Sequence, residues 1–258
     1  MQPTFLNVTQ NLLQSFGQNL ILFFSTLALA MPLGLIICFG SMNKFMPLRF
    51  LTHKDFYRHC KESESAGVED PLLLKCIKWL VVHIVEFKPI ASVSWLFVTI
   101  IRGTPLLLQL YIVFYVPGLV FGIPMRARMT ASIITFVINY AAYFSEIYRG
   151  GIESMPHGQY EAAQVLGMTK SQVFFKVILM QVVKRIVPPM SNEIITLVKD
   201  TSLARVIALP EILKAAERYT SDGLIWPLFY TGLYFLIFNA LVTVLLRAIE
   251  KKFDYYHA

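Results

Sequence analysis

Long apolar runs without charged residues dominate this 258-residue sequence and constrain its fold more than any other feature. Each run has enough residues to cross a hydrocarbon core of about 30 Å as an α-helix. Four runs cover residues 20–40, 103–125, 129–145 and 223–246. Only 15% of all residues are charged, whereas an average soluble domain has about 25%. The sequence therefore predicts an all-α membrane protein and excludes a disordered chain, a nucleic-acid-binding domain and an ordinary cytosolic enzyme.

A fifth apolar stretch, residues 186–210, is also predicted to cross the membrane, which gives five spans. It carries four charged residues, Glu193, Lys199, Asp200 and Arg205. Residues 79–101 are apolar too, but they include Glu86, Lys88 and Pro89. A sixth span there is one alternative. We favour an amphipathic helix or elbow that lies in the membrane interface and leads into the second span.

The distribution of Lys and Arg predicts the orientation of these spans. With five spans, 17 of the 23 basic residues fall in segments 41–102, 149–185 and 247–258, and four fall in segments on the other side. Basic residues collect on the cytoplasmic side of membrane proteins. We therefore expect the N-terminus outside and the C-terminus in the cytoplasm. Residues 1–18 contain no Lys or Arg, so we expect the first span to be retained rather than cleaved as a signal peptide.

The sequence predicts one transmembrane domain, residues 1–258, with two polar cytoplasmic segments. Residues 41–88 would form a loop and the interfacial helix, and residues 150–185 would form a second loop. His53, His59 and Cys60 lie in the first loop, but no second ligand pair has the spacing of a zinc site, so no metal site is expected. The chain also lacks a GxxxxGK[ST] phosphate loop.

The second loop is too polar to span the membrane and too patterned to be a passive connection. Residues 159–166 are good helix formers, and Gly167 can end that helix with a positive φ angle. Ser171 is predicted to be the N-cap of a second, amphipathic helix. The small side chains of Ala162 and Ala163 would let another surface approach closely. Glu161 alone would indicate only a solvated helix charge.

At this loop the sequence resembles the EAA loop of the transmembrane subunits of binding-protein-dependent ATP-binding-cassette (ABC) importers. The matching residues are Glu161, Ala162, Ala163, Gly167 and Leu179, while Val177 and Met180 replace the Ile and Pro of the family pattern. Other runs resemble the polar amino-acid permease subfamily. They are RGTPLLLQL at 102–110, AY at 142–143 with EIYRGG at 146–151, PHGQ at 156–159 and KDTSL at 199–203. The resemblance covers the first span and about residues 94–252.

The resemblance implies a type I ABC importer permease fold in a bacterial cell (inner) membrane. It implies that Glu161, Ala162, Ala163 and Gly167 couple this chain to a cytoplasmic ATPase dimer, which would hold ATP and Mg. It also implies a second permease subunit, identical or different, and an extracellular or periplasmic solute-binding protein. The substrate would be a small polar amino acid. The chain itself would be a transport subunit without enzymatic activity, cofactor or nucleic-acid partner.

Charged residues within a span are costly and therefore point to a function. Glu193 and Asp200 are seven residues apart and share a helix face, with Lys199 beside it. An amino acid needs a cation for its carboxylate and an anion for its ammonium group. The predicted substrate-binding residues are Glu193, Lys199, Asp200, Thr201, Ser202 and Gln109. The alternative is that these charges pair with each other or with a partner subunit. We further expect Glu146 to pair structurally with Arg102 or Arg149.

Other function classes have weaker support. A secondary transporter would work without an ATPase, so an ATPase requirement in reconstituted vesicles would distinguish it. A structural or interaction scaffold would need no catalytic residues, but it would not explain the EAA spacing. An intramembrane enzyme would need catalytic residues, and the sequence contains neither HExxH nor GxSxG.

Overall fold

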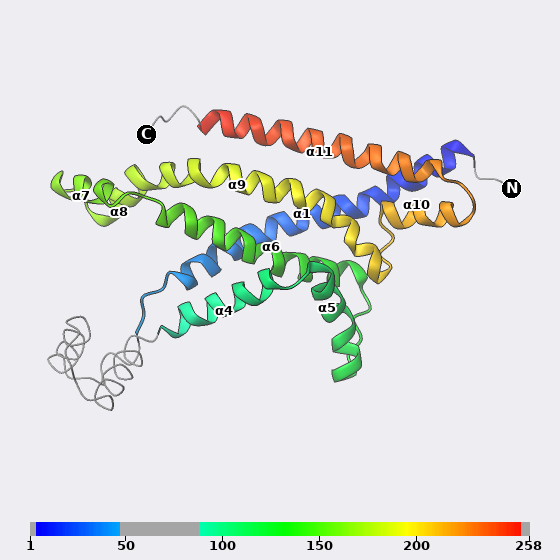
Figure 1. The fold of residues 1–258 in the computed structure, drawn as a ribbon, viewed down its shortest axis with the longest axis horizontal. Helices are drawn as coiled ribbons and strands as arrows, with labels where there is room; N and C mark the ends of the chain where they lie inside the picture. The colour runs from blue at the N-terminus through cyan, green and yellow to red at the C-terminus, as the bar shows by residue number, and fades with distance from the viewer. Residues whose placement is uncertain (1–3, 47–87, 254–258) are drawn as a thin grey trace, which may run out of the picture.

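The computed structural model describes residues 4–46 and 88–253, and every regular element in these ranges is a helix. Long helices run side by side along the longest axis of the molecule, and short helices gather at its ends (Figure 1). The long helices are α1 (Phe5–Ser41), α6 (Arg128–Glu153), α9 (Leu179–Asp200) and α11 (Trp226–Phe253). The expected all-α architecture is confirmed.

The core lies where α1, α6 and α9 pack against one another. Its largest fully buried side chains include Phe136, Tyr140 and Phe144 of α6 and Leu22 of α1. Gly34 allows α1 to approach α6 closely. A Cβ atom on Gly34 would lie 2.9 Å from the Cβ of Phe144 and 3.0 Å from the carbonyl oxygen of Ala141. The absence of a side chain at residue 34 therefore sets the spacing of these two helices.

By length and hydropathy, α1 and α11 can each cross a membrane, and they contain the first and last predicted spans. The spans predicted at 129–145 and 186–210 fall on α6 and α9. With 26 and 22 residues, these helices are about 39 and 33 Å long at 1.5 Å per residue. In the span predicted at 186–210, the α-helix α9 ends earlier than expected. It stops at Asp200 and continues as a 3₁₀-helix, η3 (Thr201–Ile207).

The span predicted over 103–125 corresponds to the helix α5 (Leu106–Phe121), which is shorter than expected at both ends. Helix α4 (Pro89–Gly103) ends where that span should begin, and α5 leaves it at an angle of 105°. The bend lies at Thr104–Pro105. Proline lacks an amide hydrogen and disfavours helical geometry in the residue before it, and Thr104 is extended (φ −118°, ψ 144°). The expected elbow therefore has a local chemical cause, and the bent pair counts as one further possible span by length and hydropathy.

Several remaining predictions concern segments outside the long helices. Most of the 41–88 loop and the start of the 79–101 segment, including His53, His59 and Cys60, lie outside the described residues. The segment 210–222, expected to be an outer loop, contains α10 (Ile212–Ser221), which packs against α1 and α11. The 150–185 loop contains α7 (His157–Val165), α8 (Lys170–Gln172) and a π-helical segment, η2 (Val173–Ile178).

Candidate functional sites

A short helix followed by a tight turn forms the tip of the 150–185 loop. Helix α7 (His157–Val165) begins two residues before the predicted helix over 159–166 and ends one residue before its end, and Gly167 has the predicted positive φ angle, 71°. The amide of Met168 donates to the carbonyl of Ala163 at 3.1 Å, and the amide of Gly167 donates to that of Gln164 at 2.9 Å. This pair of hydrogen bonds is a Schellman motif, which needs a left-handed residue at its C′ position. Glycine adopts that conformation without steric cost.

The second helix of the loop begins two residues earlier than predicted. Thr169, and not Ser171, is its N-cap. The Gln172 amide donates to the Thr169 hydroxyl, and the Gln172 side chain accepts from the Thr169 amide. These reciprocal bonds form a capping box, a pattern of Thr followed three residues later by Gln that was present in the sequence. Ser171 consequently lies inside the helix, which continues through η2 into α9.

The predicted coupling residues differ in exposure. Glu161 and Ala162 are exposed, whereas Ala163 is buried. Ala163 packs in a small core with Met155, Val173, Ile178 and Val182, which holds α7 against η2 and the start of α9. One side of the motif is therefore exposed, and the other anchors the helix.

Two large apolar side chains beside this motif were missed by the sequence analysis. Val165 is 88% exposed and Leu166 is 78% exposed, directly before the Gly167 turn. Exposed apolar groups that cluster on a polar loop mark an interaction surface. The sequence signal for this surface was the apolar pair Val165 and Leu166 at the end of a short polar helix, directly before the Gly167 turn. We call Glu161, Ala162, Val165 and Leu166 the loop tip.

A cavity of about 470 Å³ lies between the α4–α5 break, α6 and α9. It brings together one basic side chain, Arg102 from α4, and two acidic side chains, Glu193 and Asp200 from α9. The hydroxyl of Tyr140 donates to Asp200 at 2.7 Å. The guanidinium of Arg102 lies 5.2 Å from the centre of the Tyr143 ring, within range of a cation–π interaction. The remaining lining residues are Gly103, Thr104, Pro105, Leu106, Asn139, Tyr143 and Thr196.

Only Glu193 and Asp200 of the six predicted substrate residues line this cavity. Lys199 is exposed and does not belong to its wall. The Ser202 hydroxyl donates to the carbonyl of Lys199 at 2.8 Å. The sequence analysis placed Arg102 only in a structural ion pair. Its contribution to the cavity wall depends on packing between residues about ninety positions apart.

Gln109 stabilises the break between α4 and α5. Its side-chain amide donates to the carbonyls of Ile101 and Thr104 at 2.7 and 3.1 Å, and to the Thr104 hydroxyl at 2.9 Å. Its carbonyl accepts from Asn139 of α6 at 3.0 Å. The side chain thus satisfies carbonyl groups at the end of α4 and ties the break to α6. This corresponds to the interhelical role that an amide commonly has in a membrane protein.

Thr201 belongs to a different buried polar cluster. The side-chain amide of Asn19 donates to the Thr201 hydroxyl at 3.1 Å and to the Glu211 carboxylate at 3.2 Å, and the Asn19 carbonyl accepts from the amide of Ile212. Glu211 is fully buried and caps α10 through the amides of Leu213 and Lys214. Burial raises the pKa of the Glu211 carboxyl above its usual range, and these hydrogen bonds oppose that shift. The cluster joins α1, η3 and α10.

The expected ion pairs near the end of α6 are present. Glu146 pairs with Arg149 at 2.7 Å and with Arg102 at 3.5 Å, and Arg149 also pairs with Glu153. Arg205, the least expected charge of its segment, pairs with Glu217 of α10. Within residues 4–46 and 88–253, no group of three or more His, Cys, Asp or Glu side chains could hold a metal ion.

Comparisons with known proteins agree with this geometry. Residues 84–255 match the family model described as binding-protein-dependent transport system inner membrane component. The chain is 37% identical to the L-cystine transport system permease protein TcyB of Bacillus subtilis over 177 residues, which is 67% of this chain and 74% of TcyB. It is 32% identical to the arginine transport system permease protein ArtQ of the same organism, covering 64% of this chain and 76% of ArtQ.

Solved structures show the same fold. An amino acid ABC transporter crystallised with histidines superposes with a TM-score of 0.73 and 25% identity, covering 98% of this chain and 100% of that chain. An inward-facing MetNI methionine ABC transporter superposes with a TM-score of 0.62 and 13% identity, covering 98% and 99%. Both support the expected type I importer permease architecture. The chain belongs to the binding-protein-dependent ABC importer permeases, within their polar amino-acid subfamily.

Proposed function

We propose that this chain forms part of the translocation path for a polar amino acid and couples uptake to an ATPase on a separate cytoplasmic subunit. The observation that carries this proposal is the cavity that joins Arg102 to Glu193 and Asp200. One cation and two carboxylates around about 470 Å³ suit a zwitterion. The substrate carboxylate would meet Arg102, and its ammonium group would meet Asp200 or Glu193. Arg102 thus takes the role first proposed for Lys199.

Two of the other predicted substrate residues, Gln109 and Thr201, hold in place the segments that form the cavity wall. Gln109 fixes the break that carries Thr104 and Pro105 into the wall. Thr201 ties the end of α9 to α1 through Asn19. Neither side chain needs to contact the substrate to matter for transport. The relatives whose names specify cystine and arginine transport support an amino acid as substrate.

The loop tip is proposed to dock in a groove of the ATPase. Val165 and Leu166 would bury apolar surface there, and Glu161 would accept a hydrogen bond or form an ion pair. Movement of the docked tip would reach the cavity through the continuous path of η2 and α9. ATP and Mg would bind the ATPase, and a solute-binding protein would deliver the amino acid on the opposite side. A second permease subunit, identical or different, would complete the path.

The orientation is part of the proposal, with the N-terminus outside the bacterial cell membrane and residues 41–88, 150–185 and the C-terminus in the cytoplasm. Single-cysteine variants in segments 150–185 and 210–222 test it by labelling in intact cells. Only cysteines in 210–222 should react with an impermeant reagent. Labelling of segment 150–185 from outside would contradict the proposed orientation.

Reconstituted vesicles test the function itself. Uptake of a radiolabelled amino acid should require this chain, the ATPase, ATP and the binding protein. Uptake without the ATPase would instead indicate a secondary transporter. For the cavity, Glu193→Gln and Asp200→Asn should remove the protection that the transported amino acid gives the purified complex against heat. The matched variant Lys199→Gln, on the same helix but outside the wall, should keep it. Equal protection in all three variants would exclude the cavity as the substrate site.

A further inference from the structure

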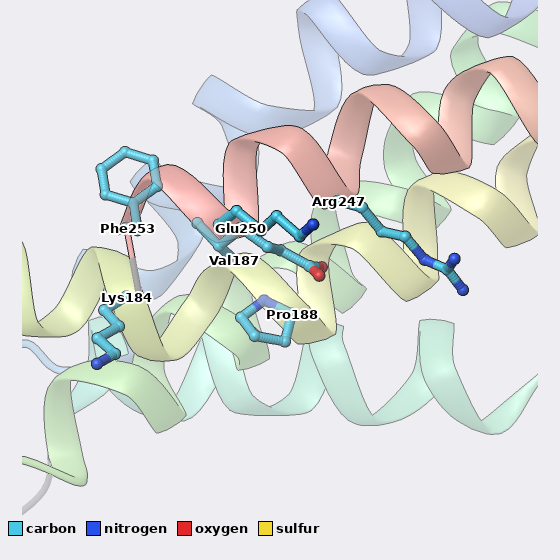
Figure 2. A pocket seen from close by; sticks show the side chains of 7 residues that line it. Lys184, Val187, Pro188, Arg247, Glu250 and Phe253 are labelled. Atoms are coloured by element: carbon cyan, nitrogen blue, oxygen red, sulfur yellow. The ribbon is translucent and has the colours of Figure 1, made fainter. Parts of the chain in front are cut away.

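A second cavity lies between the first half of α9 and the last turns of α11, away from the proposed substrate path. It has a volume of about 420 Å³. In Figure 2, Lys184 and Arg247 stand at opposite ends of this pocket, and the Glu250 carboxylate and the Pro188 ring lie between them. None of the residues given for this pocket is among those that line the proposed substrate cavity.

The pocket has an excess of positive charge. Among the described residues that line it, Arg247 and Lys251 of α11 and Lys184 of α9 are basic, and Glu250 is acidic; Lys184 has an interaction partner of its own. Arg247 and Lys251 are four residues apart and so share a face of α11. In the described part of the chain, neither of these two residues forms an ion pair. Two cations on one face of a helix favour an anionic ligand with several acceptor oxygens, such as a phosphate group.

Apolar surface continues from this pocket along α11. Leu241, Val244 and Leu245 are each more than 60% exposed, two to six residues before Arg247. None of the most hydrophobic part of α11 is buried within this chain. A ligand that carries a phosphate at one end and hydrocarbon at the other would match both surfaces. A soluble phosphate would match only the charged end.

The pocket also lies at the depth where a lipid headgroup would be. The C-terminal end of α11 and the helices of the 150–185 loop lie at the same end of the molecule (Figure 1). In the orientation proposed above, on which this inference rests, that end is cytoplasmic. Basic pockets between transmembrane helices on the cytoplasmic side bind anionic headgroups. We propose that Arg247 and Lys251, on the α11 side of this pocket, bind the phosphate of an anionic phospholipid whose chains lie along the exposed apolar surface of α11.

Thermal unfolding of the purified full-length chain in detergent tests this site. The probes are phosphatidylglycerol and phosphatidylcholine with identical acyl chains, together with inorganic phosphate and glycerol phosphate as soluble sources of the same group. Phosphatidylglycerol should raise the melting temperature at lower concentration than phosphatidylcholine, and the two soluble phosphates should have no effect. In the double variant Arg247→Gln/Lys251→Gln, the apparent affinity for phosphatidylglycerol should fall by about fivefold for each cation removed.

Two further variants separate this effect from a change in total charge or a folding defect. Arg126→Gln/Arg128→Gln removes two exposed cations before and at the start of α6 and should keep the wild-type lipid response. Arg247→Lys/Lys251→Arg keeps both charges and should restore it. The proposal is wrong if Arg247→Gln/Lys251→Gln and Arg126→Gln/Arg128→Gln both keep the wild-type response to phosphatidylglycerol, or if both lose it equally. It is also wrong if the soluble phosphates raise the melting temperature as much as the lipid does.

The readout involves neither ATP nor uptake, so it distinguishes this proposal from the proposed function. Normal ATP-dependent uptake together with equal responses to the two lipids would reject the lipid site alone. A selective lipid response in a chain that transports without an ATPase would reject the coupling proposal and leave the lipid site standing. If the ATPase abolishes the response when it binds, the pocket is part of that interface, and the lipid proposal fails.

Discussion

The hydroxyl of Tyr140 donates a 2.7 Å hydrogen bond to Asp200 and so ties the middle of α6 to the last residue of α9. The preceding residue, Asn139, donates to Gln109 at 3.0 Å and ties the same part of α6 to the α4–α5 break. Two consecutive residues thus hold two separate walls of the cavity. The position of the Asp200 carboxylate relative to Arg102 depends on both hydrogen bonds.

Tyr140→Phe should weaken substrate binding without unfolding the protein. The ring remains in the core, but Asp200 loses a donor, and leaving a partly buried acceptor without a partner costs about 1–3 kcal/mol. We expect a lower melting temperature and a smaller shift on addition of the transported amino acid. Tyr143→Phe is the control, because no hydrogen bond of that hydroxyl fixes a cavity carboxylate. An unchanged ligand response in Tyr140→Phe would show that this bond does not position Asp200 for binding.

Gly167→Val should abolish transport while the protein remains in the membrane. At a φ angle of 71°, a β-branched residue is strained, and the Schellman turn that orients the loop tip is lost. Gly167→Asn tests this reason, because asparagine tolerates the left-handed region. It should retain most of the uptake. Equal loss in both variants would indicate that the backbone angle is not the cause.

Val165→Ser/Leu166→Ser should reduce the affinity for the ATPase subunit with little change in the stability of the permease. Both side chains are largely exposed, so the permease alone loses little packing. A complex would lose the burial of two apolar side chains, each worth about 1.5–3 kcal/mol when fully buried. Co-purification of the ATPase measures the effect. Undiminished co-purification would place the docking surface elsewhere on the loop.

Asn19→Ala should destabilise the protein by about 1–3 kcal/mol, the cost of leaving buried polar groups unpaired. It removes partners from the Thr201 hydroxyl, the Glu211 carboxylate and the Ile212 amide. Asn11→Ala is the matched control on the same helix, because Asn11 is exposed and its bonds, to the Tyr219 hydroxyl in an exposed position and from the Ser15 hydroxyl at 3.5 Å, leave no fully buried group unpaired. That variant should melt close to the wild type. Similar melting temperatures for both variants would contradict a stabilising role for the buried cluster.

Gly34→Ala should also lower the melting temperature, because a Cβ atom there meets the backbone and side chains of α6. Overpacking of this kind typically costs about 1–3 kcal/mol. Gly17→Ala lies on the same helix with nothing within 4 Å of the added atom. It should be neutral or slightly stabilising, since alanine favours a helix more than glycine does. A neutral Gly34→Ala would mean that α1 and α6 can separate at little cost.

The sequence by itself determined the features that depend on neighbouring residues. Apolar runs of sufficient length predict helices in a membrane, and α1 and α11 follow from them. Gly167 ends α7 as expected because only a residue free of Cβ crowding adopts its backbone angle easily. The capping box of Thr169 and Gln172 was equally local and could have corrected the predicted start of the second helix. Pro105, likewise, could have predicted the bend that separates α4 from α5 at the start of the segment 103–125.

Tertiary structure alone decided which charges face each other. Helical periodicity places Glu193 and Asp200 on one face, but it does not tell which other helix lies opposite. Arg102 reaches this cavity because the bend at Pro105 and the Gln109–Asn139 hydrogen bond hold the end of α4 beside α6, whereas Lys199 lies outside the cavity wall. Thr201 turns to Asn19 for a similar reason, since η3 packs against the beginning of the chain. Contacts between residues far apart in sequence depend on the packing of whole helices, and no local pattern encodes that packing.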